Sequence, residues 1–228
     1  MYRPRGGYRL NRITGTVTSP PFRLVVQTAS DRFSGFPGWR RGAERLWCYS
    51  PAMTTPTLQP PFRVGHGYDL HRLEPIAPKG TGRPFVLGSL LFEHDRGPVG
   101  HSDGDALLHA VTDALLGALG EDDIGQLFPD TDPAWEGVAS TVFLEEAVQR
   151  VQKAGYGIAN LDATIILEKP KIGPRKAELR RRLAELLGVA VEQVNLKGKT
   201  HEKVDAVGEG RAVEVHVVTL LVAADHEG

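Results

Sequence analysis

Residues 63–71 read Arg63-Val-Gly-His-Gly-Tyr-Asp-Leu-His71, and this stretch decides the fold. Its β-branched and aromatic residues and its alternation predict an extended strand. Residues two apart in a strand lie on the same face, so Asp69 and His71 converge. The stretch therefore predicts a strand that presents a carboxylate and an imidazole side by side.

A second segment has helical periodicity: Ala106-Leu-Leu-His-Ala-Val-Thr-Asp-Ala-Leu-Leu116. It carries His109, which would approach Asp69 and His71 from another direction. Two imidazoles and a carboxylate suit Zn²⁺, and three protein ligands leave one position open for a substrate oxygen, as in catalytic zinc sites. The alternative is structural: a strand-end Asp and His satisfied by the backbone, and a helical His in the core.

From Arg63 onward strands and helices alternate, which predicts one mixed α/β domain of about 165 residues. Alternation and β-branched content predict strands at 63–70, 84–91, 159–168, 193–199 and 212–223. Apolar spacing predicts helices at 104–119, 140–154 and 174–187. We expect Ser102 to cap the first helix, Pro174 to open the third and Gly188 to end it.

The first 60 residues differ in composition from the rest. They contain nine Arg, no Lys and two acidic residues, Asp31 and Glu44, for a formal charge of +7. They are rich in Gly, Pro and Ser, so we expect a disordered extension over 1–60 and the folded domain over 61–228. An organellar transit peptide or a nucleic-acid-binding arm would fit this composition, and so would over-called translation upstream of a true start at Met53. We expect the last, and with it a bacterial cytoplasmic protein rather than plastid import.

The composition of the whole chain excludes several classes of protein. No apolar run approaches the length that spans a bilayer. The single cysteine, Cys48, excludes an internal disulfide framework and zinc-finger chemistry. We therefore expect a soluble protein with neither a membrane nor a nucleic acid as partner.

Three further segments could bind phosphate or a nucleotide. His101-Ser-Asp-Gly-Asp105 precedes a predicted helix, whose N-terminus attracts anions, although Ser102 could be only an N-cap. Lys169-Pro-Lys-Ile-Gly-Pro174 follows a strand and offers ammonium groups and backbone donors, although turn chemistry also explains it. Lys197-Gly-Lys-Thr-His-Glu202 lacks the upstream glycine of a P-loop, yet Thr200 and Glu202 could hold a phosphate oxygen and Mg²⁺.

An acidic loop follows the first predicted helix: Asp122-Asp-Ile-Gly-Gln-Leu-Phe-Pro-Asp-Thr-Asp-Pro133. Its carboxylates could bind ribose hydroxyls. A calcium loop is the rival, but the EF-hand spacing and its closing Glu are missing. On the helix itself, Asp105 and Asp113 lie four residues either side of His109 and could orient its imidazole, or face solvent or a loop.

Taken in order, these segments resemble the 2-C-methyl-D-erythritol 2,4-cyclodiphosphate synthase family of the non-mevalonate isoprenoid pathway. The likeness covers about residues 63–223, and the matching stretches are Gly65–His71, His101–His109, Asp123–Asp132, Pro170–Lys171 and Thr200–Glu202. The resemblance implies a homotrimer with active sites between subunits. Each subunit would hold a mainly four-stranded mixed sheet covered by helices on one face.

The resemblance also implies the reaction. The substrate would be 4-diphosphocytidyl-2-C-methyl-D-erythritol 2-phosphate, whose 2-phosphate attacks the β-phosphorus, closes a cyclic diphosphate and releases CMP. Asp69, His71 and His109 would hold Zn²⁺ or another divalent transition metal, and Glu202 would hold Mg²⁺ or Mn²⁺. Two alternatives remain open: a metal-dependent phosphohydrolase and a non-catalytic nucleotide-binding module.

Further site residues are implied by the same resemblance. His101 and Thr200 would be catalytic, gripping the 2-phosphate and the β-phosphate. The substrate-binding residues would contact the 2-phosphate, the ribose or erythritol, the methylerythritol and the cytosine, in chain order: Ser102; Asp123, Ile124 and Gly125; Phe128, Pro129, Asp130, Thr131 and Asp132; Leu167, Pro170, Lys171, Ile172 and Gly173. Lys199 and Glu202 complete this set.

One stretch departs from the family pattern. Many members have Thr-Gly-Arg-Gly-Glu-Gly where this chain has Val207-Gly-Glu-Gly-Arg-Ala212. The Arg and the Glu have exchanged places, so a ligand that meets Arg there in relatives would meet Glu209. We therefore expect an anion in the central cavity of the trimer to bind weakly.

Overall fold

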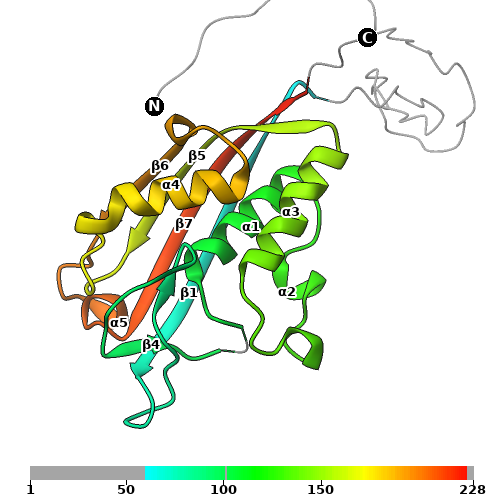
Figure 1. The fold of residues 1–228 in the computed structure, drawn as a ribbon. Coiled ribbons are helices and arrows are strands. Elements are labelled where there is room, and N and C mark those ends of the chain that lie inside the picture. The colour runs from blue at the N-terminus through cyan, green and yellow to red at the C-terminus, as the bar shows by residue number, and fades with distance from the viewer. Residues whose placement is uncertain (1–59, 101, 225–228) are drawn as a thin grey trace, which may run out of the picture. The chain divides into compact units, whose positions relative to one another are not determined.

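The structure is a computed structural model that describes residues 60–100 and 102–224 (Figure 1). The expectations of a disordered extension and of a start at Met53 lie outside the described residues, as does His101. Among the residues described, none of the helices has the length and apolar character needed to cross a membrane.

The centre of the fold is a five-stranded mixed sheet with the strand order β4-β1-β7-β5-β6. Its strands are β1 (Phe62–Pro75), β4 (Arg96–Pro98), β5 (Tyr156–Ile166), β6 (Val194–Lys199) and β7 (Ala212–Ala223). β5 and β6 run parallel, and the other neighbours are antiparallel. The mixed sheet was predicted with four main strands. The fifth, β4, has three residues that pair only with the end of β1, which is too short a run to show alternation.

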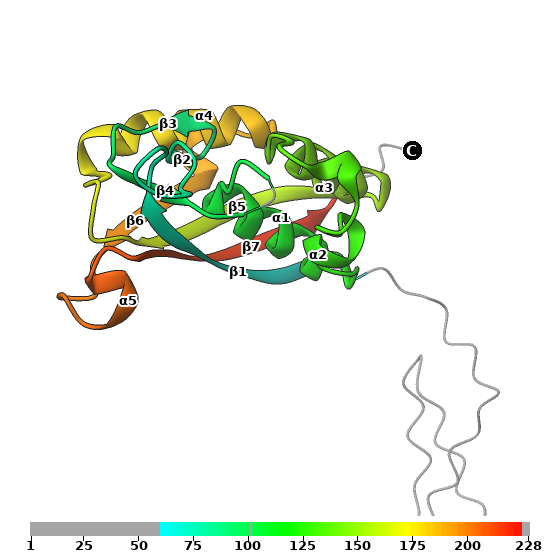
Figure 2. The same cartoon turned by 90° about the horizontal axis from the view of Figure 1, so that it is seen from below.

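Three helices cover one face of the sheet: α1 (Ala106–Leu119), α3 (Thr141–Lys153) and α4 (Lys176–Leu187) (Figures 1 and 2). This confirms the predicted helices and their placement on one face. Pro174 lies in a 3₁₀ turn, η2 (Gly173–Arg175), directly before α4, and Gly188 ends α4 with a φ of 67°. Shorter elements were not predicted: α2 (Ile124–Leu127), α5 (Asp205–Gly208), η1 (Pro133–Trp135) and η3 (Val191–Gln193).

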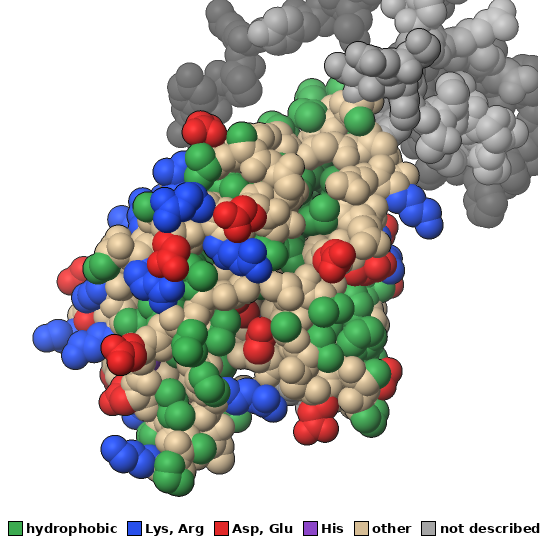
Figure 3. All heavy atoms as spheres, viewed as in Figure 1, with side chains coloured by type: hydrophobic (Ala, Val, Ile, Leu, Met, Phe, Trp, Pro, Cys, Tyr) green, Lys and Arg blue, Asp and Glu red, His purple; other side chains and the backbone are tan. Residues whose placement is uncertain are grey.

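The central helix α1 is buried on almost every side. Leu107, Leu108, Leu115 and Leu116 are at most 1% exposed. A helix that is apolar all round belongs in a core, and α1 lies between the sheet and α3. In contrast, α4 carries Lys, Arg and Glu side chains on its outer surface (Figure 3).

The predicted strand at 84–91 is wrong, because the segment folds back on itself. It forms a hairpin of β2 (Val86–Leu87) and β3 (Leu90–Leu91). The two turn residues, Gly88 and Ser89, have φ values of 60° and 61°. Two consecutive positive φ values are typical of a type I′ turn, which reverses an antiparallel hairpin.

The other face of the sheet is bare within the described residues (Figure 2). Alternate residues of β1 and β7 point to it, and several are large and apolar. Their exposed fractions are 62% for Phe62, 65% for Val64, 46% for Tyr68, 47% for Leu70, 46% for Val218 and 40% for Val222. An exposed apolar stripe of this kind is typical of a contact surface.

Candidate metal centre and nucleotide site

Two glycines of β1 bring α1 into direct contact with the strand. A Cβ atom on Gly65 would lie 1.8 Å from the Ala114 carbonyl oxygen, and one on Gly67 would lie 1.8 Å from that of Ala110. Any side chain would therefore push the helix away. Ala110 directly follows His109, so the approach at Gly67 fixes the distance between His109 and β1.

The three predicted ligands, Asp69, His71 and His109, meet at this contact, and we call them the metal cluster. Asp69 and His71 point to the helix-covered face of β1, and His109 reaches them from α1. The Asp69 Oδ2 atom lies 3.0 Å from His71 Nδ1 and 3.2 Å from His109 Nδ1. One ligand atom from each residue fits within a common distance of 4.8 Å.

This geometry fits a tetrahedral divalent cation. Zn²⁺ holds nitrogen and oxygen ligands at about 2.0–2.2 Å, so neighbouring ligands of a tetrahedron lie about 3.4 Å apart. The two measured separations, 3.0 and 3.2 Å, are close to that edge length. Both imidazoles present Nδ1 to the same carboxylate oxygen, so one ion could contact all three residues.

The charges of the cluster are strongly coupled. Burial alone would raise the pKa of Asp69, but hydrogen bonds from His109 and His71 outweigh it and hold that pKa at about 2. Burial lowers the pKa of His71, whereas the hydrogen bond to Asp69 and its negative charge raise it above the usual value in the net. The carboxylate is thus ionised, as a metal ligand must be.

Two serine hydroxyls contact the outer nitrogen of His109. Ser140 Oγ lies 2.8 Å from His109 Nε2, and Ser102 Oγ lies 3.2 Å from the same atom. Ser102 was predicted to cap α1, and that prediction is wrong. Asp105 is the cap residue, because its carboxylate accepts a hydrogen bond from the Leu108 amide.

Asp105 and Asp113 do not orient His109. The Asp105 carboxylate is fully buried and accepts hydrogen bonds from the amides of Gly88, Ser89 and Leu108. Asp113 accepts one from the Ile124 amide at 2.8 Å. Both carboxylates hold backbone turns, and burial raises the pKa of each.

Sequence reasoning missed Ser140 and Asp103 as neighbours of the metal cluster. Ser140 entered the sequence analysis only as the start of the predicted helix 140–154. No local spacing links it to His109, because their contact depends on how α3 packs against α1. Asp103 lies inside a quoted motif, but its partner is 37 positions away in the chain.

The predicted acidic loop 122–133 folds into two short turns beside the metal cluster. Asp123 caps α2 and Asp132 caps η1. The loop connects to the cluster through stacked rings: Phe128 lies 4.7 Å from Phe143, whose ring is 6.2 Å from that of His109. Ile124 and Pro129 are half-buried, whereas Gly125, Asp130 and Thr131 are exposed.

The remaining predicted residues gather at the ends of β5 and β6. The Leu167 amide donates to the Lys199 carbonyl, and Ile172 packs at the backbone of Gly198. Thr200 Oγ1 donates to Glu202 Oε1 at 3.4 Å. Pro170 is half-buried, Gly173 is exposed, and the exposed Lys171 lies 3.7 Å from Glu168.

This group is separated from the metal cluster in one chain. Asp69 pairs with Val215, which pairs with Ile165, which pairs with Gly198. At a strand spacing of about 4.8 Å, three steps amount to about 14 Å. Within one chain the predicted site therefore forms two separate halves. The first half is Asp69, His71 and His109, and the second half is the group at the ends of β5 and β6.

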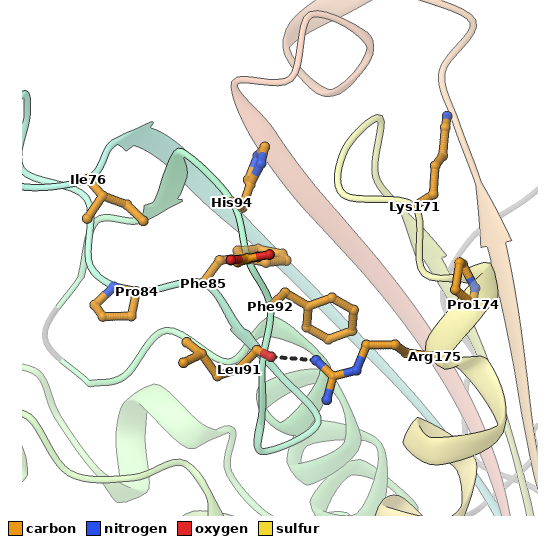
Figure 4. Close-up of a pocket in the computed structure, with 10 residues that line it drawn as sticks. Ile76, Pro84, Phe85, Leu91, Phe92, His94, Lys171, Pro174 and Arg175 are labelled. Atoms are coloured by element: carbon orange, nitrogen blue, oxygen red, sulfur yellow. Dashed lines mark hydrogen bonds between the residues drawn. The ribbon is translucent and has the colours of Figure 1, made fainter.

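A pocket of about 620 Å³ adjoins the second half (Figure 4). Phe85, Phe92 and Pro174 supply apolar walls, and Lys171 and Arg175 line it with positive charge. The Arg175 guanidinium lies 4.5 Å from the centre of the Phe92 ring and donates to the Leu91 carbonyl. The exchanged pair lies elsewhere, after α5, where Arg211 Nε donates to Glu209 at 2.7 Å.

Comparison with known proteins places the chain among enzymes. Residues 62–222 match the model of the YgbB family. A 2-C-methyl-D-erythritol 2,4-cyclodiphosphate synthase of Arabidopsis thaliana, described as chloroplastic, is 57% identical over 167 residues, which cover 73% of this chain and 70% of the relative. The synthase of Ralstonia pickettii is 49% identical over 164 residues, covering 72% of this chain and 94% of the relative.

The fold is also similar to those of solved structures of such enzymes. The IspF protein of Plasmodium falciparum in complex with CDP superposes with a TM-score of 0.62 at 34% identity. The match covers 72% of this chain and 97% of that protein.

The similar plant enzymes correct one expectation. We expected a bacterial cytoplasmic protein, but relatives that are 54–57% identical, from Arabidopsis thaliana, Catharanthus roseus and Oryza sativa, are described as chloroplastic. The expectation rested on the interpretation of residues 1–60 as over-called translation, and the descriptions of these relatives contradict it. By sequence and by fold, the chain belongs to the YgbB family, whose similar members are 2-C-methyl-D-erythritol 2,4-cyclodiphosphate synthases.

Proposed function

We propose that the protein converts 4-diphosphocytidyl-2-C-methyl-D-erythritol 2-phosphate to 2-C-methyl-D-erythritol 2,4-cyclodiphosphate with release of CMP. The observation that carries this proposal is the convergence of Asp69, His71 and His109 within 4.8 Å, in a chain of this family. The CDP complexes of similar enzymes support a cytidine diphosphate moiety in the substrate.

The residues would act mainly by holding two phosphates in line. His101 and the Ser102 hydroxyl bind the 2-phosphate, and Thr200 binds the β-phosphate. A phosphate oxygen is already an anion near neutral pH, so the attack needs no general base. Alignment of the attacking oxygen with the leaving CMP then lowers the barrier.

Asp69, His71 and His109 would hold Zn²⁺, and Glu202 would hold Mg²⁺. Cations bound there would supply Lewis-acid chemistry and neutralise negative charge on the phosphates. The protein residues keep the donors rigid, because β1 and α1 are locked together at Gly65 and Gly67. Asp123 to Gly125 would bind the ribose or the erythritol, residues 128–132 would cover the methylerythritol, and residues 167–173 would bind the cytosine.

The activity is tested by incubating the full chain with the substrate, with Zn²⁺ and Mg²⁺ present or chelated, and identifying both products by mass. We expect metal-dependent CMP together with the cyclic diphosphate. A linear phosphate product would instead show a hydrolase. Nucleotide binding without turnover would show a binding module.

The proposed active form is a homotrimer. The two halves of the site lie about 14 Å apart within one chain, so a neighbouring subunit would have to bring the second half to the first. The bare, apolar face of the sheet offers the surface for that contact. Phe62, Val64, Tyr68 and Leu70 supply much of it.

A single charge on the bare face tests the trimer. Val64→Lys should yield monomers in analytical ultracentrifugation and lose turnover, because the lysine would be buried without a partner. Val142→Lys is the matched control, since Val142 is 44% exposed and lies on α3, away from the bare face. A Val64→Lys protein that stays trimeric would contradict the assignment of this face.

We further propose that the protein functions in a plastid and that residues 1–60 contain its import signal. Nine Arg and only two acidic residues fit a transit peptide, which is rich in Arg and poor in acids. Fusion of residues 1–60 to a fluorescent protein should direct it to plastids. Cytosolic fluorescence, with native protein that begins at Met53, would support a start at Met53 instead.

A further inference from the structure

The outer nitrogen of His109 has a defined partner. The Nδ1 atom faces Asp69 Oδ2 at 3.2 Å and is the atom available to a cation, whereas Nε2 points away from the cluster. A neutral imidazole carries one proton, so an Nδ1 that binds metal requires the proton on Nε2. The group that accepts this proton in a hydrogen bond, Ser140 Oγ at 2.8 Å, therefore affects how His109 binds metal.

The Ser140 hydroxyl is itself held by a carboxylate. Its Oγ donates a short hydrogen bond to Asp103 Oδ1, and its backbone amide donates to Asp103 Oδ2 at 3.1 Å. Ionised carboxylates only accept hydrogen bonds, so the single hydroxyl proton must point toward Asp103. The lone pairs of Ser140 Oγ are then left for the N–H of His109.

We propose that Asp103 and Ser140 are positioning residues that hold His109 in the Nε2–H tautomer and aim its Nδ1 at the cation. This inference rests on the proposed metal site. Neither residue belongs to the group of three that could hold the ion. They act through His109, as outer carboxylates and hydroxyls do for metal-bound imidazoles.

The two serines at His109 have different surroundings. Ser140 is fully buried, and α3 gains no cap from its side chain. Ser102 is only half-buried, its contact with His109 Nε2 is longer at 3.2 Å, and its Oγ accepts a hydrogen bond from the Gly104 amide at 3.1 Å. Ser102 is thus available to a phosphate, while Ser140 remains with the imidazole.

The hydrogen bonds from Asp103 through Ser140 to His109, which we call the relay, also link two helices. Asp103 precedes α1, Ser140 precedes α3, and His109 lies on α1. The Asp103 amide adds a bond to the Val138 carbonyl at 3.3 Å. The orientation of His109 therefore depends on the packing of α3 against α1, and not on α1 alone.

The test uses the purified full chain and measures Zn²⁺ affinity by competition with a chromophoric chelator. Ser140→Ala should bind Zn²⁺ about 10- to 100-fold more weakly, the range typical for loss of an outer partner of a metal ligand. The substitution removes no cap and keeps the backbone bond to Asp103. In ¹⁵N NMR of the Zn²⁺-loaded protein, the Nε2–H proton of His109 should exchange with solvent faster in Ser140→Ala than in the wild-type protein, because its acceptor is gone.

Thr112→Val is the matched control. Thr112 is also a fully buried hydroxyl, on the same helix as His109, but it donates to the Leu108 carbonyl at 2.8 Å. This variant should lose thermal stability while keeping wild-type Zn²⁺ affinity and wild-type exchange of the His109 Nε2–H proton. A general loss of packing would weaken Zn²⁺ binding in both variants, and that result would overturn the relay.

Asp103→Asn is the second variant, in case Ser140→Ala does not fold. A side-chain amide has only one oxygen, so it cannot accept at both positions where the carboxylate oxygens accept from the hydroxyl and the amide of Ser140. The same loss of affinity and the same faster exchange are therefore expected. If either folded variant keeps wild-type affinity and wild-type exchange of the His109 Nε2–H proton, the relay is wrong, whereas wild-type turnover would still support the proposed function. If the wild-type protein binds Zn²⁺ no better than His109→Ala, the metal site and the relay both fail.

Discussion

The side chains of Asp69, His71 and His109 are only 21%, 15% and 12% exposed, whereas the Lys171 side chain in the other half of the site is 62% exposed. The first half is fixed by direct contact between β1 and α1. The second half, with Glu202 and Thr200, lies on turns beyond the ends of β5 and β6. A single chain thus preorganises the predicted metal ligands and leaves the predicted nucleotide-binding residues open.

This difference indicates that metal affinity and turnover depend on different levels of structure. Metal affinity should follow from the fold of one subunit, because all three ligands come from β1 and α1. Turnover should depend on both halves and hence on assembly. Four predictions test this separation.

The largest effect is expected for His109→Ala. Loss of an outer partner already weakens metal binding by about 10- to 100-fold, so loss of a ligand should reduce Zn²⁺ affinity and turnover by more than about 100-fold. Nucleotide affinity should change little, since the second half is intact. Chelator competition and CMP release measure the first two quantities, and calorimetry with CDP measures the third. Wild-type turnover would rule out the metal cluster.

Gly67→Ala should disrupt the first half of the site by pushing the backbone of α1 away from β1. The added Cβ would meet the Ala110 carbonyl oxygen, so we expect a loss of about 3 kcal/mol in the free energy of unfolding and weaker Zn²⁺ binding. Urea denaturation measures the stability. Gly157→Ala in β5 is the matched control, because nothing lies within 4 Å of its Cβ position. Equal stability of the two variants would disprove the close contact.

Glu202→Gln should affect only the second half. Removing one charged ligand costs about 1.5–3 kcal/mol, which corresponds to a turnover about 10- to 100-fold slower at subsaturating Mg²⁺. Zn²⁺ affinity should equal that of the wild-type protein. If Zn²⁺ binding also weakens, the two halves are coupled within one chain.

The smallest effect is a pH dependence of metal binding. The pKa of His71 in the metal-free protein is raised by Asp69, and metal binding must release its proton. Affinity should therefore fall as pH decreases through that raised pKa, by up to about tenfold per pH unit for each proton released. Calorimetry in buffers of different ionisation enthalpy counts the protons. No proton release near neutral pH would contradict the raised pKa.

Much of the fold could be predicted because its main elements have strong periodicity. β1, α1 and β7 carry their own pattern, and Gly188 ends its helix as a positive φ requires. The hairpin at Val86–Leu91 could not be predicted from the apolar run alone, since the turn lies inside it at Gly88 and Ser89. β4 and α5 are too short to show a period.

In the candidate site, too, some residues could be predicted from local sequence and others could not. Asp69 and His71 are two residues apart in a strand, so their convergence follows from local geometry. The partner of His109 Nε2 could not be predicted, because Ser140 reaches it only when α3 packs on α1. The role of Asp105 could not be predicted for a related reason: its spacing from His109 is helical, but as the cap its carboxylate accepts from the helix amide and the hairpin turn.

The Asp105 carboxylate has a further consequence, for the motions of the native protein. One side chain protects the amide protons of Gly88 and Ser89 in the hairpin turn and of Leu108 in the first turn of α1. Opening of the hairpin therefore also frees the helix end, and the three amides should exchange with solvent as one cooperative unit. Local opening of the hairpin and of the first turn of α1 should therefore occur together.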